Sequence, residues 1–361
     1  MKINLIFFIS NFSFGGAGNS IVKLCEALDK NKYSISIICL GKSGYKNILI
    51  KNNIKLFEIN RTKLLFSLFK LTKIINNLIS KNKKNILISN IHYNNTIILL
   101  LKRFFKPIKI IIVERTPIEE LNIYFNLIDF IKKNVLKFLV KYVYNRADLV
   151  IANSNGIRHG LAKLITKKIR VIYPPSINKI YKNHKIKKKI TTAFCVTRLS
   201  LEKNIICILR AFNELKNEKL ILNIYGNGSE KKKLMLFVNK NNLKNKIFFK
   251  GFKRNIDKIS DEIYISSSLF EGCGNATIEA INNSKIIISS DCPGGNKEIL
   301  LNGKGGNLFK NDNEFNLAAI IKKVIRNPKS NYKKTFKAKL KLQRFLLTNN
   351  KKKYEKIFSN L

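Results

Sequence analysis

Acidic residues are scarce in this chain of 361 residues: 22 Asp and Glu stand against 69 Lys and Arg, which gives a formal net charge of +47. So large a positive charge favours anionic partners, whether nucleic acid, an anionic membrane surface or phosphorylated substrates. The lysines are dispersed rather than gathered in one tail, so a bias of composition across the whole chain explains the charge equally well. Both interpretations are open on the sequence alone.

Long hydrophobic runs and paired cysteines are also missing. No apolar run reaches the length of a membrane span, and polar residues and glycines follow the short run at 3–9, so we expect a first strand there. The six cysteines include no C-x-x-C pair and no metal-ligand spacing, which predicts small buried side chains in a cytoplasmic protein. The chain has no zinc module and no basic cluster interleaved with aromatic residues. A nucleic-acid-binding function is therefore disfavoured.

Apolar strand candidates alternate with helical stretches along most of the chain. They lie at 3–10, 34–40, 54–59, 85–89, 108–113, 148–152 and 169–173 in the first half, and at 192–197, 219–225, 247–250, 263–268 and 286–290 in the second. This alternation predicts an α/β fold with a parallel, doubly wound sheet in each half. Pro174-Pro175 ends regular structure, and a lysine-rich stretch follows. We predict an N-terminal domain at 1–175, a linker at 176–190 and a C-terminal domain at 191–335.

The first strand runs into a glycine-rich turn, S-F-G-G-A-G at 13–18, which leads into a helix. Backbone amides in such a turn can face a phosphate, so Gly15 and Gly16 are candidate ligand-binding residues, although a plain strand-to-helix turn fits as well. The turn is not G-x-G-x-x-G. The second strand ends in Gly41-Lys42 rather than in an acid that could hold a cofactor ribose. A nicotinamide-dependent enzyme is therefore disfavoured.

Polar residues follow two later strands of the first half. His92 comes after the strand at 85–89, and Glu114 and Arg115 come after the strand at 108–113. Ligands bind at the carboxyl ends of parallel strands, so we expect Glu114 and Arg115 to face a ligand cleft. A single histidine is more often structural than catalytic, and we favour a structural role for His92.

A long helical pattern at 122–146 combines an apolar stripe with lysines. We interpret the stripe as the core-facing side of an ordinary helix whose lysines face solvent. An apolar stripe beside lysines could instead rest on an anionic bilayer. The apolar residues are Leu127, Phe130, Ile131, Val135, Phe138, Leu139 and Tyr142, and the lysines are Lys132, Lys133, Lys137 and Lys141.

In the second half, charged residues follow two strands. Arg198 and Lys203 come after the strand at 192–197, and a guanidinium fork with an ammonium charge suits the binding and departure of a diphosphate. Glu271 comes after the strand at 263–268, where a carboxylate can accept hydrogen bonds from sugar hydroxyls. A helix is expected from about Asn275, with the Asn275 side chain as its cap and Glu279 one turn in. Amides at the start of that helix favour an anion such as a phosphate.

The segment E-G-C-G-N-A-T-I-E-A at 271–280 resembles the E-x7-E signature of the retaining GT4-type glycosyltransferases. V-T-R-L-S-L-E-K-N at 196–204 is similar to the family's R-L-x-x-E-K motif, and S-S-D-C-P-G-G-N-K-E-I at 289–299 looks like its segment after the next strand. The resemblance covers most of the chain and is strongest from 191 to 299. It implies the GT-B architecture, with two facing Rossmann-like domains, and a last helix at 336–361 that packs back on the N-terminal domain.

The resemblance also implies a function. The protein would be a retaining hexosyltransferase that moves a sugar from a nucleotide-diphosphate donor, expected to be UDP-linked, to a glycan or lipid-linked acceptor in cell-surface polysaccharide or lipopolysaccharide synthesis. It would act in the cytoplasm, peripherally on the inner face of the cytoplasmic membrane. Because the chain has no D-x-D motif, we expect no metal and no cofactor besides the nucleotide sugar.

Each motif position carries an implied role. Arg198 and Lys203 would neutralise the leaving nucleoside diphosphate, Glu271 would hold donor-sugar hydroxyls, and Glu279 would hold the ribose hydroxyls. The expected catalytic residues are Glu271, Arg198 and Lys203. The expected donor-binding residues are Gly15, Gly16, Arg198, Lys203, Glu271, Gly272, Cys273, Gly274, Asn275 and Glu279.

Four positions depart from the family pattern. Cys273 stands where an aromatic residue is common, Ser284 where glycine is common and Ile286 where proline is common, and Glu114-Arg115 stands where many members carry a histidine. Two other functions stay open: a GT-B enzyme of different chemistry, such as a sugar-nucleotide epimerase, and a basic nucleic-acid-binding protein.

Overall fold

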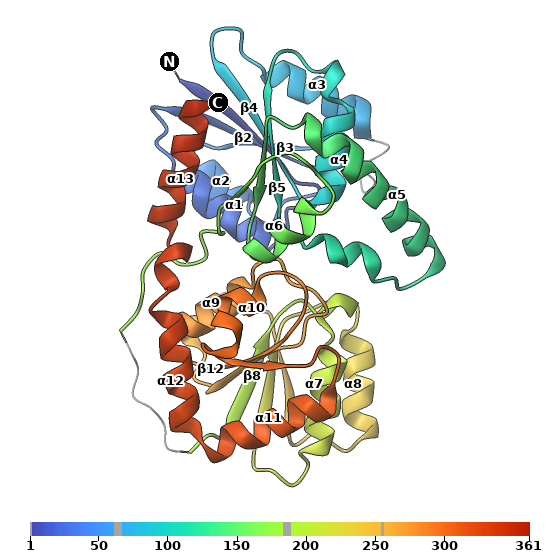
Figure 1. Ribbon diagram of the computed structural model, residues 1–361, viewed down its shortest axis with the longest axis vertical. Helices are drawn as coiled ribbons and strands as arrows, with labels where there is room; N and C mark the ends of the chain where they lie inside the picture. The colour runs from blue at the N-terminus through green and yellow to red at the C-terminus, as the bar shows by residue number, and fades with distance from the viewer. Residues whose placement is uncertain (1, 61–66, 183–188, 254–255) are drawn as a thin grey trace. The chain divides into compact units, whose positions relative to one another are not determined.

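The computed structural model describes residues 2–60, 67–182, 189–253 and 256–361, and the chain forms two compact units (Figure 1). Unit 1 comprises Met1–Ser176 and Leu347–Leu361, and unit 2 comprises Ile177–Leu346. The chain thus leaves unit 1 directly after the two prolines at 174–175 and returns to it for its last helix. Part of the linker predicted at 176–190, namely 183–188, lies outside the described residues.

Unit 1 is built on a seven-stranded parallel sheet in the order β3-β2-β1-β4-β5-β6-β7. Its strands are β1 (Ile3–Phe8), β2 (Tyr33–Cys39), β3 (Lys55–Glu58), β4 (Lys84–Asn90), β5 (Lys109–Glu114), β6 (Leu149–Ala152) and β7 (Ile169–Val171). Its α-helices are α1 (Gly16–Ala27), α2 (Lys46–Lys51), α3 (Leu68–Leu78), α4 (His92–Leu100), α5 (Leu127–Val143), α6 (Asn155–Ala162) and α13 (Leu347–Asn360). The sheet order reverses between β1 and β4, the kind of position at which open α/β sheets bind ligands.

Both faces of this sheet are covered, as the apolar strands require. Leu5 and Phe7 of β1 belong to one buried cluster, whereas Ile6 and Phe8 belong to another. Successive side chains of a strand point to opposite faces, so the two clusters are the two cores of a doubly wound sheet. Helix α13 contributes Phe358 to the first cluster, so the end of the chain completes a core that its beginning starts.

Unit 2 repeats the same plan with a six-stranded sheet in the order β10-β9-β8-β11-β12-β13. Its strands are β8 (Thr192–Val196), β9 (Ile221–Tyr225), β10 (Ile247–Gly251), β11 (Ile263–Ser266), β12 (Ile286–Ser290) and β13 (Asn307–Phe309). Its α-helices are α7 (Ile205–Glu214), α8 (Lys231–Lys240), α9 (Asn275–Asn282), α10 (Asn296–Ile299), α11 (Glu314–Arg326) and α12 (Pro328–Lys339). The predicted α/β fold with a parallel sheet in each half is confirmed, and β13 is an additional strand that the sequence pattern did not predict.

Helix α5 corrects one prediction. Six of the seven residues of the stripe interpreted as core-facing are exposed, and Leu127 keeps 73% and Phe138 61% of its accessible surface. The buried side chains of α5 are Lys133, Leu136, Val140 and Val143. The prediction failed because the three apolar residues among these form the contact between α5 and the rest of unit 1. Lys133 also lies inward, where its Nζ donates to the carbonyl of Ile123 (2.7 Å) and pairs with Asp129 (3.0 Å). Within the described ranges, no helix is long and apolar enough to cross a bilayer.

Candidate functional site

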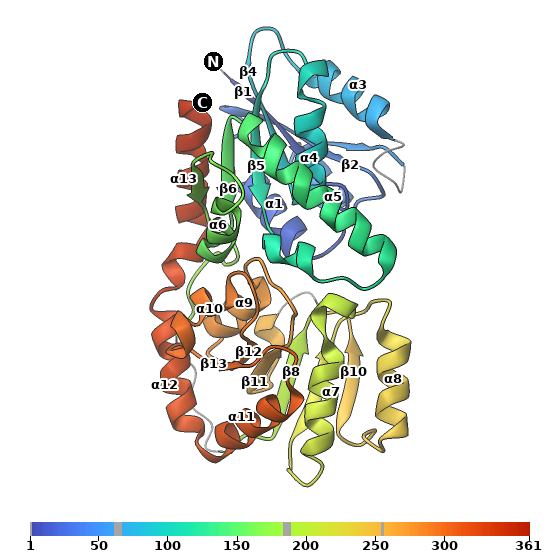
Figure 2. The same ribbon diagram turned by 45° about the vertical axis from the view of Figure 1, so that its right-hand side comes forward.

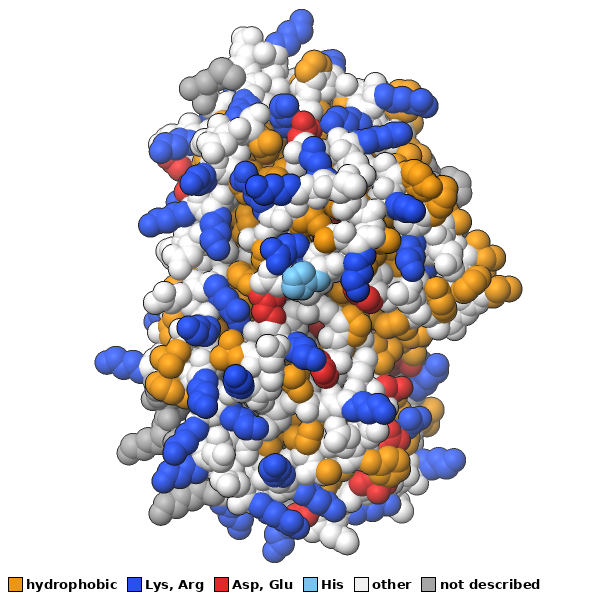
Figure 3. Space-filling view, in the orientation of Figure 1, with side chains coloured by type: hydrophobic (Ala, Val, Ile, Leu, Met, Phe, Trp, Pro, Cys, Tyr) orange, Lys and Arg blue, Asp and Glu red, His pale blue; other side chains and the backbone are white. Residues whose placement is uncertain are grey.

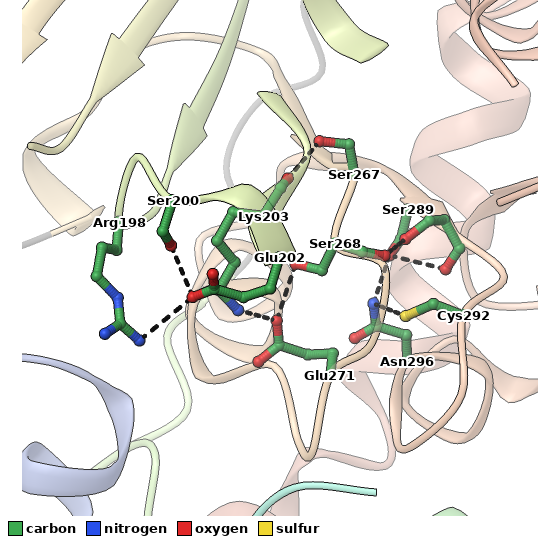
Figure 4. A network of polar contacts seen from close by, with 11 residues as sticks. Arg198, Ser200, Glu202, Lys203, Ser267, Ser268, Glu271, Ser289, Cys292 and Asn296 are labelled. Carbon is green, nitrogen blue, oxygen red and sulfur yellow. Dashed lines mark hydrogen bonds and ion pairs between the residues drawn. The ribbon is translucent and has the colours of Figure 1, made fainter. Parts of the chain in front are cut away.

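The loops that carry the predicted charged residues of unit 2 meet where its sheet order reverses. Strands β8 and β11 are neighbours, with Ala193 opposite Ile263, and the loops after them converge at their carboxyl ends. There Lys203 Nζ lies 2.6 Å from Glu271 Oε2 (Figure 4). Both side chains are about four-fifths buried, since 18% and 21% of their surfaces are accessible. The structure therefore joins the R-L-x-x-E-K and E-x7-E segments through a direct ion pair.

Hydrogen bonds from the run of serines after β11 hold this pair in place. Ser268 Oγ donates to Glu271 Oε2 (3.0 Å), and the single proton of Ser267 Oγ is shared between the carbonyl oxygens of Lys203 and Asn204, each 2.9 Å away. These serines were not among the predicted site residues. Their signal was a run of three hydroxyl residues, S-S-S at 266–268, at the carboxyl end of a buried strand.

The main chain of Glu271 is fixed from the other side by the loop after β12. The amide of Glu271 donates to the carbonyl of Pro293 (3.1 Å), and the amide of Gly295 donates to the carbonyl of Glu271 (3.0 Å). Asn296, which follows, is buried and donates from Nδ2 to Ser289 Oγ (2.9 Å). The segment 289–299 thus supports the acidic loop, and Asn296 is a supporting residue that the sequence analysis did not single out.

Arg198 reaches outward from the same loop as Lys203. Its side chain keeps 65% of its accessible surface, and its Nη2 lies 3.6 Å from Glu202 Oε1, which also accepts a hydrogen bond from Ser200 (2.6 Å; Figure 4). A guanidinium that makes one loose ion pair and keeps most of its surface accessible can bind an anion from solvent.

Two glycines after β9 let a neighbouring loop pass against the segment that carries Arg198. A Cβ on Gly226 would lie 1.8 Å from the carbonyl oxygen of Thr197, and one on Gly228 would lie 2.1 Å from that of Leu199. Neither position can hold a side chain unless the backbone shifts, and Gly226 also has a φ of +148°. The G-N-G-S sequence directly after a strand was the signal for this contact.

The second glycine loop opens helix α9. Asn275 is the first residue of that helix, Gly274 precedes it, and no side chain makes a cap hydrogen bond, so the prediction of an Asn275 cap is wrong. A Cβ on Gly274 would lie 2.9 Å from Thr277 Oγ1 and 3.0 Å from Asn296 Oδ1, which explains the glycine. Glu279 lies one turn into α9 and is partly buried. The first amides of a helix lack helical acceptors, so this end of α9 suits a phosphate.

Three departures from the family pattern have a structural counterpart here. Desolvation by burial raises the pKa of the Cys273 thiol well above its ordinary value, which favours the neutral thiol beside Gly272. Ser284 has a φ of +55°, a conformation that favours glycine, and its hydroxyl accepts a hydrogen bond from Lys339 Nζ (2.8 Å). Ile286 donates its amide to the carbonyl of Glu262 (3.0 Å), a bond that proline could not make.

Gly15 and Gly16 lie in unit 1, at the turn between β1 and α1, and both are exposed. The amide of Gly15 donates to Tyr45 Oη (3.2 Å), and a Cβ on Gly15 would meet no atom within 4 Å. Packing within the chain therefore does not require glycine at this position. The other predicted site residues all belong to unit 2.

The polar residues of unit 1 form a buried network instead of an exposed edge. Glu114 is buried and accepts hydrogen bonds from Asn95 Nδ2 (2.6 Å) and from Tyr144 Oη. His92 lies between Glu114 and Glu120, each 3.5 Å from one ring nitrogen. Burial opposes a charge on His92, but the hydrogen bond and charge of Glu114, together with Glu120, raise its pKa.

The expectation that Glu114 and Arg115 face a cleft is therefore wrong for Glu114, whose donors come from α4 and from the 3-10 helix η4 (Tyr144–Arg146). Arg115 Nε donates to Asn90 Oδ1 (2.8 Å). In the part of the chain that the structure describes, no group of three His, Cys, Asp or Glu side chains could hold a metal ion.

Known proteins resemble this chain in sequence and in fold. A curated relative from Campylobacter jejuni, "N-acetylgalactosamine-N,N'-diacetylbacillosaminyl-diphospho-undecaprenol 4-alpha-N-acetylgalactosaminyltransferase", is 30% identical over 57% of this chain and 58% of its own length, so the match spans less than two thirds of that protein. An uncharacterized glycosyltransferase of Methanocaldococcus jannaschii is 28% identical over 78% of this chain and 73% of its own.

Among solved structures, Anabaena HepE in complex with UDP and glucose superposes with a TM-score of 0.81, at 16% identity over 99% of this chain and 100% of that one. Sucrose-phosphate synthase from Thermosynechococcus elongatus gives 0.83, at 15% identity over 99% of both chains. These likenesses support the predicted two-domain GT-B fold. Two family models match the chain in turn, "Glycosyltransferase Family 4" over 14–175 and "Glycosyl transferases group 1" over 176–341. The chain belongs to the GT4-type glycosyltransferases.

Proposed function

We propose that this protein transfers a hexose from a UDP-sugar, with retention of anomeric configuration, to a glycan or lipid-linked acceptor in the synthesis of a cell-surface polysaccharide. The observation that carries the proposal is the Lys203–Glu271 pair at the switch point of unit 2, with Arg198 on the same loop as Lys203. Cations for a diphosphate and a carboxylate for sugar hydroxyls then lie side by side. The transferase class itself rests on the two matched family models and on the relatives' names.

The orientation of Glu271 supports its proposed role in binding the sugar. Lys203 and Ser268 both contact its Oε2, and Oε1 points away from them (Figure 4). In our proposal Oε1 accepts hydrogen bonds from donor hydroxyls, while Glu279 in α9 holds the ribose hydroxyls. Because Lys203 fixes the carboxylate before the donor arrives, little reorganisation is needed when the sugar binds.

Arg198 and Lys203 supply the electrostatic part of the reaction. Negative charge grows on the diphosphate as the glycosidic bond breaks, and two cations aimed at it stabilise the transition state more than the ground state. The acceptor hydroxyl attacks on the face that the leaving group vacates, so the configuration is retained without a covalent enzyme nucleophile. The chemistry of these side chains needs no metal ion.

The donor and acceptor classes rest on the relatives' names and on the structures' ligands. HepE was solved with UDP and glucose, the Campylobacter relative is named for a diphospho-undecaprenol substrate, and a Bacillus subtilis relative is named a poly(glycerol-phosphate) alpha-glucosyltransferase. The two curated names thus describe a lipid-linked acceptor and a polymeric acceptor. The proposed site of action is the cytoplasmic face of the membrane.

Thermal unfolding with a panel of nucleotide sugars tests the donor site. The wild type should be stabilised by one UDP-sugar, and Glu279→Ala and Arg198→Ala should each abolish the shift, because each removes a contact to the donor. Arg210→Ala is the matched control, since Arg210 is also a half-exposed arginine of unit 2 but lies on α7, paired with Glu314 (3.9 Å).

A shift that survives in both variants, or that Arg210→Ala also removes, would contradict the assigned donor site. Release of UDP that requires an added acceptor would establish transfer. Turnover of the nucleotide sugar without an acceptor would instead indicate an epimerase or a hydrolase.

A further inference from the structure

Helix α5 and the turn before it carry an unusual concentration of exposed apolar side chains. Among the described residues, nine of the 25 exposed large hydrophobic side chains lie between 124 and 142. They are Tyr124, Phe125, Leu127, Ile128, Phe130, Ile131, Val135, Phe138 and Tyr142, and we call them the apolar ridge. Figure 3 shows hydrophobic side chains gathered along the right-hand edge of the molecule, over α5. A contiguous exposed apolar surface of this kind marks an interaction site.

Six of the nine ridge residues are continuous along one side of the helix. Adjacent residues of an α-helix are turned by roughly 100° about its axis, and on that basis six ridge residues fall within an arc of about 100°. In order around the helix they are Leu127, Phe138, Ile131, Tyr142, Val135 and Ile128. The four buried residues of α5, Lys133, Leu136, Val140 and Val143, lie on the opposite side. The helix thus has two apolar faces. One packs against the rest of unit 1 beside α4 (Figures 1 and 2), and the other is exposed.

Charge is arranged on both sides of the ridge. Lys132 borders it on one side, and Lys137 and Lys141 border it on the other, at the angles that helical geometry gives. The one acidic residue of α5, Asp129, is turned toward the packed side, where it pairs with Lys133 (3.0 Å) and accepts a hydrogen bond from the amide of Phe125 (3.2 Å). The exposed side of α5 therefore presents apolar side chains flanked only by positive charge.

This arrangement matches the interface of an anionic bilayer. A ridge from Leu127 to Tyr142 is about 22 Å long, and it would lie flat, with its apolar side chains among the upper acyl chains and its lysines at the phosphates. The helix does not qualify as a membrane span. The formal charge of +47 adds long-range attraction to the same surface. We propose that α5 is a membrane-docking helix that inserts the apolar ridge into the headgroup region of bilayers rich in acidic phospholipid.

The absence of tryptophan from the chain makes insertion directly measurable. Phe138→Trp places a single fluorophore in the ridge, and Phe315→Trp places one at a comparably exposed phenylalanine of unit 2. With vesicles of phosphatidylglycerol and phosphatidylcholine, the Trp at 138 should shift to shorter wavelength and be quenched by brominated acyl chains, whereas the Trp at 315 should not respond. No response at 138, or an equal response at both positions, would overturn the proposal.

Vesicle flotation with matched variants distinguishes insertion of the ridge from electrostatic adsorption that depends only on the net charge of the protein. Ile131→Ser with Phe138→Ser leaves the charge unchanged and should weaken binding by at least about tenfold, because two side chains lose their burial in the bilayer. The control Leu236→Ser with Phe315→Ser changes two exposed apolar residues of unit 2 and should bind like the wild type.

Lysine variants test the flanking charges. Replacing Lys132, Lys137 and Lys141 by glutamine should weaken binding to anionic vesicles more than replacing Lys232, Lys233 and Lys240 of α8, although both triple variants lose three charges. Equal losses would assign binding to net charge and overturn the proposal. Equally, if the wild type ignores vesicles but dimerises in sedimentation, and the ridge variant is monomeric, then a second copy of the chain covers the ridge and the proposal is wrong.

Discussion

The ion pair between Lys203 and Glu271 joins the two loops of the candidate site in unit 2, and breaking it should destabilise that unit measurably. Lys203→Met leaves the Glu271 carboxylate in a site that is about four-fifths buried, with the Ser268 hydroxyl as a remaining donor. Glu271→Gln leaves the ammonium group facing an amide. Neither replacement changes the side-chain length much, so packing is nearly preserved in both variants.

The magnitude follows from the burial of the pair. Breaking a fully buried ion pair costs about 3–5 kcal/mol, and exposed pairs contribute about 0–1 kcal/mol. With roughly a fifth of each side chain accessible, each single variant should lose about 2 kcal/mol of unfolding free energy. For a unit of this size that corresponds to a fall of about 4–8 °C in melting temperature. The double variant should lose far less than the sum, with a coupling energy of about 1.5 kcal/mol or more.

Scanning calorimetry of the wild type, the two single variants and the double variant provides a double-mutant cycle for unfolding free energy. Nucleotide-sugar binding is measured on the same samples. The loss of stability in the double variant should be clearly smaller than the sum of the two single losses while donor binding stays lost, because only the wild-type pair offers both a cation and a carboxylate. Lys297→Met with Asp291→Asn is the control, since that more exposed pair (3.1 Å) should couple weakly. If the Lys203 and Glu271 losses simply add, the two side chains do not interact in solution and the proposed preorganisation is refuted.

Two further predictions concern the backbone of the site and the buried network of unit 1. Gly228→Ala should lower stability by about 1–3 kcal/mol and reduce transfer by tenfold or more, because the new methyl group displaces the carbonyl of Leu199 beside Arg198. In unit 1, Glu114 and Glu120 raise the pKa of His92, so the folded state binds the proton more tightly than the unfolded chain. The stabilising effect of that proton is complete below the ordinary histidine pKa of about 6.5 and is lost as pH rises through the raised pKa. Unfolding free energy measured across pH should therefore fall over this range, and His92→Gln should flatten the dependence.

Each of these has a matched control. A Cβ on Gly41 would meet no atom within 4 Å, so Gly41→Ala should leave stability and transfer almost unchanged. His159→Gln alters an exposed histidine on α6 and should keep the wild-type pH profile. A Gly228→Ala enzyme with full activity would show that the loop contact does not position Arg198. A pH profile unchanged by His92→Gln would show that the imidazole is not held charged between its two carboxylates.

Much of this fold could be predicted because its strands are strongly apolar. Runs such as I-I-I-S-S at 286–290 are buried on both faces and leave little ambiguity about a parallel sheet. Strand β13 escaped because it has three residues, Asn307–Phe309, and its place is set by pairing with β12 rather than by its own composition. The Asn275 cap was mispredicted because Gly274 packs against Asn296, a contact between segments that no local pattern contains.

The candidate site was predictable where charge and strand ends coincide, and less so where support comes from elsewhere in the chain. Lys203 and Glu271 were each predicted because they follow a buried strand and lie in a motif that resembles the family's, and the structure shows that the two strands are neighbours. The roles of Gly226 and Gly228 were missed because their partners lie on a different loop. Helix α5 was misread for a related reason: a helical pattern shows which residues share a face, but not which of two apolar faces meets the core.

The return of α13 to unit 1 has a consequence for the order in which the protein is made. Tyr354, Ile357 and Phe358 belong to the same buried cluster as Leu5 of the first strand. When the first 176 residues have left the ribosome, this cluster still lacks those side chains, and it stays incomplete until all of unit 2 has been synthesised. Unit 2 is continuous in sequence and needs no such wait. The half of the protein that is synthesised first is therefore the half that finishes folding last.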